Sequence, residues 1–289
     1  MKFVMQCRKI PVFYHIPKNA GTYVSDWLLI AFRHYRRTYT DWLKNFSPNR
    51  DSIKCLQVKN NEFIVAKFLI GDPNYFCETL AVFDKKHSKT EWDIDINNLT
   101  EELLSNVFLF GIIIEARGFS CHDKLIKLAT NYDLHRFIIL REPFFRAQSF
   151  YNYITSDLSA HERTHGKIKS LTFEDYVISE QLEDSWLIRN LNNISNSTPI
   201  NEDLYQQTVE TLKQFHVFHI KETDKALQET FLTCYDFDIT RIERHAWDML
   251  TKNETSNKKI NFEQLSLEAQ TAFKNRTYWD ERLFKTFIR

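Results

Sequence analysis

The sequence predicts a single α/β domain built on a central parallel sheet, and three observations lead to this prediction. The chain has 289 residues, of which 43% are hydrophobic and 26% charged, so it can bury one large core. Short, almost continuously apolar runs recur along it, as expected of strands that are covered on both faces. Segments with helical periodicity separate these runs, and that alternation is typical of βαβ units.

Five apolar or aromatic runs are the predicted strands. They lie at 12–15, 63–66, 107–114, 137–140 and 215–220. An apolar stripe from Val24 to Tyr35 predicts a helix at 22–36, and Pro143 occupies the position that proline favours at the start of a second one. Further helices are expected at 120–131, 171–192, 201–213, 222–235, 263–273 and 277–288.

Composition excludes several classes of protein. The 38 basic and 38 acidic residues give a formal net charge of zero, so no global field draws the chain to nucleic acid or membrane. Five scattered cysteines without C-x-x-C spacing indicate neither a metal site nor a disulfide framework. No repeat, linker or membrane-spanning stretch is visible, so residues 1–289 are predicted to form one domain. We expect it to act in the cytoplasm, or in the Golgi lumen if an anchor lies upstream.

The first strand-to-helix junction has the features of a phosphate-binding loop. Residues 13–23 read FYHIPKNAGTY: a strand ends, a tight turn with Pro17 and Gly21 follows, and a helix begins near Thr22. The free N–H groups of a first helical turn and the positive end of the helix dipole attract anions, and Lys18 adds a charge. The segment is not a Walker A loop. On this segment alone, an ordinary turn with Thr22 as the N-cap residue remains the other interpretation.

A second junction places an arginine at the end of an apolar strand. Residues 137–151 read FIILREPFFRAQSFY, so Arg141 ends the strand and Ser149 follows about two helical turns later. An arginine can bind a phosphate through two parallel hydrogen bonds, and a serine hydroxyl can add another donor. Alternatively, Arg141 pairs with Glu142 and Ser149 faces solvent.

The two junctions together resemble a known family. Residues 15–22 (HIPKNAGT) resemble the 5′-phosphosulfate loop of the Golgi-type carbohydrate sulfotransferases, H-I-P-K-T-G-G-T. Residues 140–151 resemble their 3′-phosphate segment, L-R-D-P-x-x-R-x-x-S-x-Y, with the same spacing from arginine to serine. The similarity is greatest to the heparan sulfate 2-O- and chondroitin branch. Residues 215–223, 257–259 and 275–284 resemble later family segments, so the resemblance runs from about residue 11 to the end.

This resemblance implies a P-loop-like fold and a reaction. A sulfuryl group would pass in line from 3′-phosphoadenosine-5′-phosphosulfate (PAPS) to a hydroxyl of a carbohydrate or glycoconjugate, leaving 3′,5′-diphosphoadenosine. Lys18 would neutralise the leaving phosphate oxygen, the loop would hold the 5′-phosphosulfate, and Arg141 with Ser149 would hold the 3′-phosphate. The implied nucleotide contacts are Lys18, Asn19, Ala20, Gly21, Thr22, Tyr23, Arg141, Ser149, Lys258 and Lys259. No metal is implied.

The catalytic base is where the sequence departs from the family. The family commonly has Gly-His at the end of the strand before the arginine strand, but here Gly111 is followed by Ile112, which cannot accept a proton. Glu115 is the preferred substitute, because a partly buried glutamate can act as a base near neutral pH. His122 and His15 are the alternatives. In addition, His161 and His165 lie where contacts to the acceptor would be expected.

Two other functions remain open from the sequence. The substitution at Ile112 would also fit a nucleotide-binding module that has lost its chemistry. A P-loop kinase would need a Walker lysine and a Mg²⁺-binding aspartate, neither of which is found. The neutral net charge favours a weakly charged saccharide, a glycolipid or a small alcohol as the acceptor over a polyanionic glycan.

Overall fold

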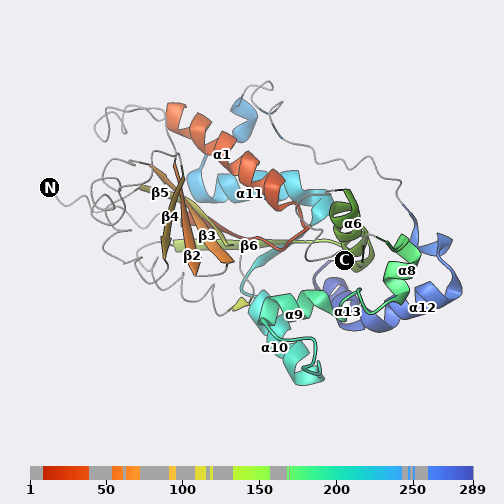
Figure 1. Cartoon of the computed structure of the whole chain (residues 1–289). Helices are drawn as coiled ribbons and strands as arrows, with labels where there is room; N and C mark the ends of the chain where they lie inside the picture. Colours follow the sequence, from red (N-terminus) through yellow and green to blue (C-terminus); the bar gives the residue numbers. More distant parts are fainter. Residues whose placement is uncertain are drawn as a thin grey trace.

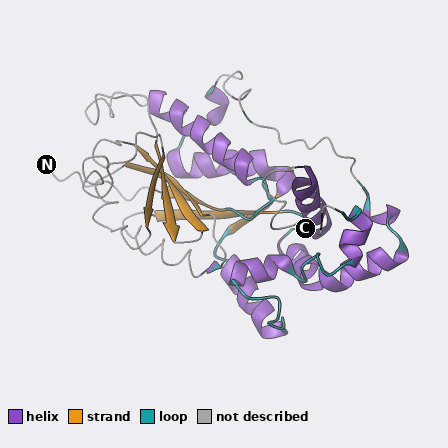
Figure 2. Cartoon of the chain, viewed as in Figure 1, coloured by secondary structure: helices purple, strands orange, loops and turns teal. Residues whose placement is uncertain are grey.

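A seven-stranded sheet with helices on both sides forms the centre of the molecule (Figures 1 and 2). The computed structural model describes residues 9–38, 54–60, 63–71, 91–95, 108–114, 118–119, 133–156, 168, 170–242, 247, 250 and 260–288. The strands are β1 (Lys9–Tyr14), β2 (Lys54–Asn60), β3 (Phe63–Gly71), β4 (Glu91–Asp95), β5 (Phe108–Ile114), β6 (Asp133–Leu140) and β7 (His216–His219). They are arranged in the order β4-β2-β3-β5-β1-β6-β7.

The four strands β5, β1, β6 and β7 are mutually parallel, which confirms the predicted α/β class with a central parallel sheet. Their registers bring the carboxyl ends together, because Tyr14 pairs with Ile114 on one side and with Ile138 on the other. On the far side of β6, Leu140 pairs with His219. The loops after β1 and β6 therefore leave the sheet at the same edge, where ligands bind in parallel α/β sheets.

The other half of the sheet departs from the prediction. Strand β3 runs antiparallel to both β2 and β5, so the run at 63–66 was wrongly assigned to the parallel part. Only two residues separate β2 from β3, and so short a connection permits only an antiparallel return. Strands β2 (KCLQVKN) and β4 (EWDID), which pair in parallel, were not predicted because polar residues interrupt their apolar pattern.

The helices confirm most of the predicted periodicity. They are α1 (Gly21–Thr38), α6 (Pro143–Ser156), α8 (Phe173–Ile178), α9 (Trp186–Asn192), α10 (Glu202–Leu212), α11 (Thr223–Tyr235), α12 (Leu267–Arg276) and α13 (Tyr278–Phe287), with 3₁₀ turns at Ile220–Glu222, Ile239–Arg241 and Phe262–Gln264. None of the helices in these ranges is long and apolar enough to cross a membrane. The helix expected at 120–131 lies outside the described residues.

Each face of the parallel strands is covered by different helices. Tyr14 packs in one apolar cluster with Leu187 of α9 and Val209 of α10. The next residue inward, Phe13, belongs to a second cluster with Trp27 of α1 and Phe231 of α11. Figure 1 shows α1 and α11 together on one side of the sheet, away from α9 and α10. Because alternate residues of β1 are buried on opposite faces, the strand reads as a continuous apolar run.

The predicted helix at 171–192 is in fact two helices. Helix α8 ends at Ser179, whose backbone is extended, and α9 begins after Ser185, whose backbone is left-handed. The first turn of α9 is capped from a distant part of the chain, because the Asp280 carboxylate accepts hydrogen bonds from Leu187 N (2.8 Å) and Ile188 N (3.1 Å). A cap supplied from α13 cannot be recognised from local sequence.

Candidate functional site

The loop between β1 and α1 has an unusual backbone that is held in place on both sides. Lys18 (φ 70°) and Ala20 (φ 63°) are in the left-handed region, which costs on the order of 1 kcal/mol or more for a residue other than glycine. His15 N donates to Ile114 O of β5 at 2.7 Å, and the buried Asn19 Nδ2 donates to Ile139 O of β6 at 3.0 Å. Such a strained but anchored backbone is typical of a functional loop.

Gly21 lets the chain fold tightly at the start of α1. A Cβ atom at this position would lie 1.7 Å from Nε2 of His15, so the imidazole ring occupies the space that a side chain would need. The same ring stacks on Phe13, with centroids 5.9 Å apart. The helix begins at Gly21, so Thr22 is exposed in the first turn and is not the N-cap residue. The N–H groups of this turn have no intrahelical acceptor.

The side chain of Lys18 contacts α6. Its Nζ lies 3.1 Å from the centroid of the Tyr153 ring, a cation–π contact. Burial, followed by the positive charge of Arg141, lowers the pKa of Lys18 from 10.5 to about 8. The ammonium is therefore still mostly protonated at neutral pH, but it lies in surroundings that disfavour a positive charge.

Arg141, at the end of β6, contacts the loop that follows β1. Its Nη1 donates to the backbone carbonyl of Lys18 at 3.4 Å, and burial lowers the pKa of its guanidinium. The adjacent Glu142 faces other partners: it accepts hydrogen bonds from His219 Nε2 (3.0 Å) and Lys221 Nζ (3.3 Å). Burial alone would raise the pKa of Glu142, but the hydrogen bond and charge of His219, a backbone hydrogen bond and the hydrogen bond from Lys221 together hold the pKa below its usual value.

Two positive charges thus lie close together at the end of the sheet, and the neighbouring Glu142 carboxylate partly offsets that of Arg141. In the described part of the chain, neither Lys18 nor Arg141 forms an ion pair with a carboxylate. Partly buried cations are normally paired, so this arrangement would be stabilised by an anion between them. The first turn of α1 supplies N–H donors at the same place.

One face of α6 looks toward this site. Residues three and four positions apart share a helix face, so Arg146, Ser149 and Tyr153 lie together. Tyr153 contacts Lys18, and the buried Arg146 stacks on the Trp186 ring of α9 at 3.8 Å. Ser149, between them, is half-buried. The sequence did not predict either aromatic contact, although Tyr153 follows Ser149 by four positions and therefore lies on the same helix face.

The predicted site residues have different outcomes. Lys18 and Arg141 are brought into contact, with Thr22 exposed nearby. The hydroxyl of Tyr23 donates to Asp224 of α11, so it links two helices. The contact of Ser149 with a nucleotide stays a prediction. Glu115, His122, His161, His165, Lys258 and Lys259 lie outside the described residues, so their assignments also stay predictions.

The position of Ile112 corrects one argument from the sequence. Ile112 pairs with Val12 in the middle of β5 and is only 1% exposed, so it belongs to the core of the sheet. The strand ends two residues later, at Ile114. A histidine at 112 would not reach the carboxyl edge, and the isoleucine is therefore no evidence against a base further along the chain.

Comparisons with known proteins identify no relative of this chain. A scan against protein-family models, a search of curated proteins and a search of solved structures all return no match.

Proposed function

We propose that this protein is a PAPS-dependent sulfotransferase that moves a sulfuryl group to a hydroxyl of a carbohydrate or glycoconjugate. The observation that carries the proposal is the meeting of Lys18 and Arg141, two partly buried cations that form no ion pair within the described residues, at the amino end of α1. PAPS carries a phosphosulfate and a separate 3′-phosphate, so it offers one anionic group to each cation. The family resemblance supports the same assignment.

The residues of the chain divide the work between binding and charge neutralisation. The N–H groups of the first turn of α1 and the Thr22 hydroxyl would hold the 5′-phosphosulfate. Lys18 would place its ammonium on the phosphate oxygen that gains charge as the S–O bond breaks. An anion beside Lys18 would raise its pKa back toward the ordinary value, which keeps it protonated when charge develops. Arg141 would bind the 3′-phosphate, with Ser149 as a further donor.

The left-handed backbone of the loop fits this role. With Lys18 and Ala20 held in place by the hydrogen bonds of His15 and Asn19, the donors are oriented before the ligand arrives. Donors that are fixed in advance need no reorganisation during the reaction. A reducing compartment such as the cytoplasm fits the proposal, because the five cysteines are scattered and have no C-x-x-C spacing.

A binding module without chemistry was the main alternative, and it depended on Ile112. Since Ile112 lies inside β5, that argument no longer favours it. Glu115, the first residue after β5, is our proposed base, with His122 and His15 as the alternatives. His15 is the least suitable of the three, because its ring is held against Gly21.

Calorimetric titration with 3′,5′-diphosphoadenosine tests the donor half of the proposal. We expect Lys18→Ala and Arg141→Ala each to weaken binding by about 10- to 100-fold, the usual effect of losing a charge-assisted hydrogen bond. Lys213→Ala is the matched control, because Lys213 is an exposed lysine paired only with Glu210 on α10. Wild-type protein that ignores 3′,5′-diphosphoadenosine but is stabilised by ATP–Mg²⁺ would contradict the proposal and favour a kinase.

Transfer of labelled sulfate from PAPS to a glycan mixture tests the chemical half. We expect transfer by the wild-type protein, and its loss in Glu115→Gln with binding of 3′,5′-diphosphoadenosine unchanged. Loss in His122→Ala instead would move the base to His122. Tight binding of PAPS without transfer to any acceptor would leave only the binding module.

A further inference from the structure

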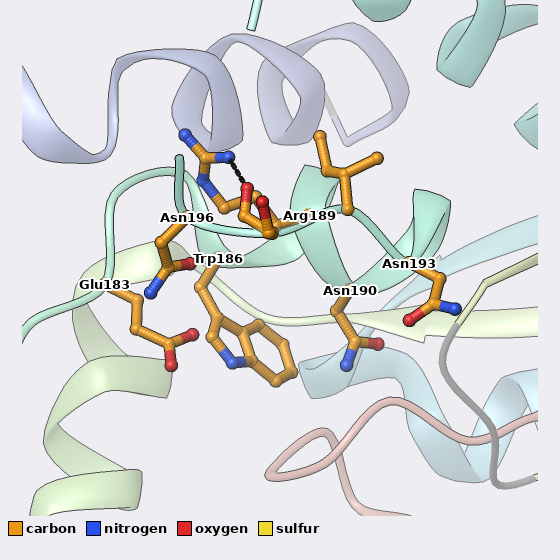
Figure 3. A pocket seen from close by; sticks show the side chains of 8 residues that line it. Glu183, Trp186, Arg189, Asn190, Asn193 and Asn196 are labelled. Atoms are coloured by element: carbon orange, nitrogen blue, oxygen red, sulfur yellow. Dashed lines mark hydrogen bonds between the residues drawn. The ribbon is translucent and has the colours of Figure 1, made fainter. Parts of the chain in front are cut away.

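A small polar pocket lies beside α9. It has a volume of about 210 Å³ and is formed by the loop before α9, the helix itself and the loop that follows it (Figure 3). Its lining residues are Glu183, Trp186, Arg189, Asn190, Asn193, Ile194, Ser195 and Asn196. Pockets for drug-sized ligands are usually about 300–1,000 Å³, so this one has room for a single small ring.

Arg189 holds the two loops of the pocket together and uses most of its hydrogen-bond donors to do so. Its Nε and Nη2 donate to the backbone carbonyl (2.8 Å) and carboxylate (3.0 Å) of Asp184, and its Nη1 donates to the carbonyls of Ser195 (2.5 Å) and Thr198 (2.7 Å). In Figure 3 its side chain points away from those of Glu183, Trp186 and Asn190. Arg189 thus fixes the loop after α9 to the loop before it, with four of its five N–H donors engaged.

What the pocket offers instead is unpaired hydrogen-bond acceptors. Asn190 is only 6% exposed, and its Oδ1 accepts no hydrogen bond from the residues described. Glu183 forms no hydrogen bond or ion pair within the same part of the chain. A buried acceptor without a partner is costly, so a group that donates to Asn190 would be stabilising.

These acceptors define the chemistry of a ligand. It must donate hydrogen bonds to Asn190 and Glu183, and the only cation of the lining, Arg189, is already neutralised. A sulfate or carboxylate group would be repelled by the charge of Glu183, although Glu183 also interacts electrostatically with the buried Arg146 that stacks on Trp186. The indole of Trp186 adds an apolar wall. A neutral, hydroxyl-rich ring therefore fits, whereas an anionic sugar does not.

The pocket is joined to the carboxyl edge of the sheet from two directions. Gly118 N, just beyond β5, donates to Asn190 O at 2.8 Å, and Arg146 of α6 stacks on Trp186. Ile16, in the loop after β1, belongs to the same apolar cluster as Trp186. The pocket therefore adjoins the segments that carry Lys18 and Arg141.

We propose that this pocket binds a neutral sugar ring or a comparable small polyol, whose hydroxyls donate to Glu183 and Asn190. That the bound ring is the acceptor rests on the proposed function, whereas its binding does not. The inference narrows the acceptor to an uncharged terminal residue and argues against a polyanionic glycan at this position.

The proposal can be tested by titrating the protein with methyl glycosides of glucose, galactose and N-acetylglucosamine. Binding is followed by NMR of the Trp186 indole and the Asn190 amide. We expect at least one to bind, and Glu183→Gln to weaken it about tenfold through loss of a charged acceptor. Glu180→Gln is the matched control, since Glu180 is exposed and outside the lining. Asn190→Leu should weaken binding similarly, and methyl glucuronide should bind more weakly than methyl glucoside.

Two results would overturn the inference: no neutral glycoside shifts these signals, or Glu183→Gln binds as well as wild type. A parallel titration with 3′,5′-diphosphoadenosine separates this inference from the proposed function. If the nucleotide binds in a Lys18-dependent way and the glycosides do not, the pocket is not a sugar site and donor binding stands. If the glycosides bind and the nucleotide does not, the sulfotransferase proposal fails and the sugar site stands.

Discussion

Replacing Gly21 by alanine should damage the loop through one identifiable contact. An added Cβ would lie 1.7 Å from His15 Nε2 and 2.0 Å from its Cδ2, whereas Cβ atoms in proteins essentially never approach other heavy atoms closer than 3.0 Å. The clash involves a ring, not the backbone. The ring must therefore move by more than an ångström, away from its stack on Phe13.

The size of the effect follows from what the ring loses. A stacked pair contributes about 0.5–1.5 kcal/mol, and forcing extra atoms into a packed site costs about 1–3 kcal/mol. Alanine in a helix gains up to about 1 kcal/mol over glycine, which offsets part of this cost. We therefore expect Gly21→Ala to lower the free energy of unfolding by about 1–2 kcal/mol.

Urea denaturation followed by circular dichroism can measure this, with His15→Ala as the partner variant. In the double variant the ring is absent, so Gly21→Ala should cost nothing further, and the two changes should couple by about 1–2 kcal/mol. Additive effects of the two substitutions, or a Gly21→Ala protein as stable as wild type, would refute the reasoning. The packing of His15 on the start of α1 would then be wrong.

Three further predictions concern charge. Because burial and Arg141 lower the pKa of Lys18 to about 8, affinity for 3′,5′-diphosphoadenosine should fall as the pH rises through about 8, and Lys18→Arg should remove this fall in a calorimetric pH series. Burial raises the pKa of Asp280 from its ordinary value of 3.8 to about 6, so the folded state binds this proton more tightly than the unfolded state does. The stabilisation that results is complete below about pH 4. As the pH rises through about 6, the free energy of unfolding falls by about 3 kcal/mol. Asp280→Asn should flatten that part of the pH profile in denaturant titrations, and an unchanged slope would count against a buried carboxyl. His219→Ala should free Glu142 to pair with Arg141, and this pairing should weaken binding of the nucleotide several-fold. Adding Glu142→Gln should restore the affinity for the nucleotide. If the affinity does not recover, His219 does not act through Glu142.

Local sequence was sufficient for the parts of the fold that carry the candidate site. The β1 loop and α6 each follow directly from an apolar strand, and Gly21 and Pro143 mark where the two helices begin. Because parallel strands end at one edge, the sequence could also predict that Lys18 and Arg141 would lie near each other. In the structure, Arg141 Nη1 donates to the backbone carbonyl of Lys18.

The remaining features depend on long-range contacts. Tyr153 becomes part of the site only because α6 packs across the loop, and Asp280 caps a helix more than 90 positions earlier in the chain. The antiparallel β3 was mistaken for a parallel strand because the apolar pattern alone does not encode strand direction. The pocket beside α9 depends on Arg189 bridging two loops, which no spacing in the sequence indicates.

The position of β1 between β5 and β6 has a consequence for biosynthesis. β1 is the first strand among the described residues, yet its neighbours begin at residues 108 and 133, so both of its edges remain unpaired until those strands are made. At a translation rate of about 5–20 residues per second, that interval lasts roughly 5–25 s on the ribosome. During this time the apolar β1 segment has no strand partner, so a chaperone that covers it would limit aggregation.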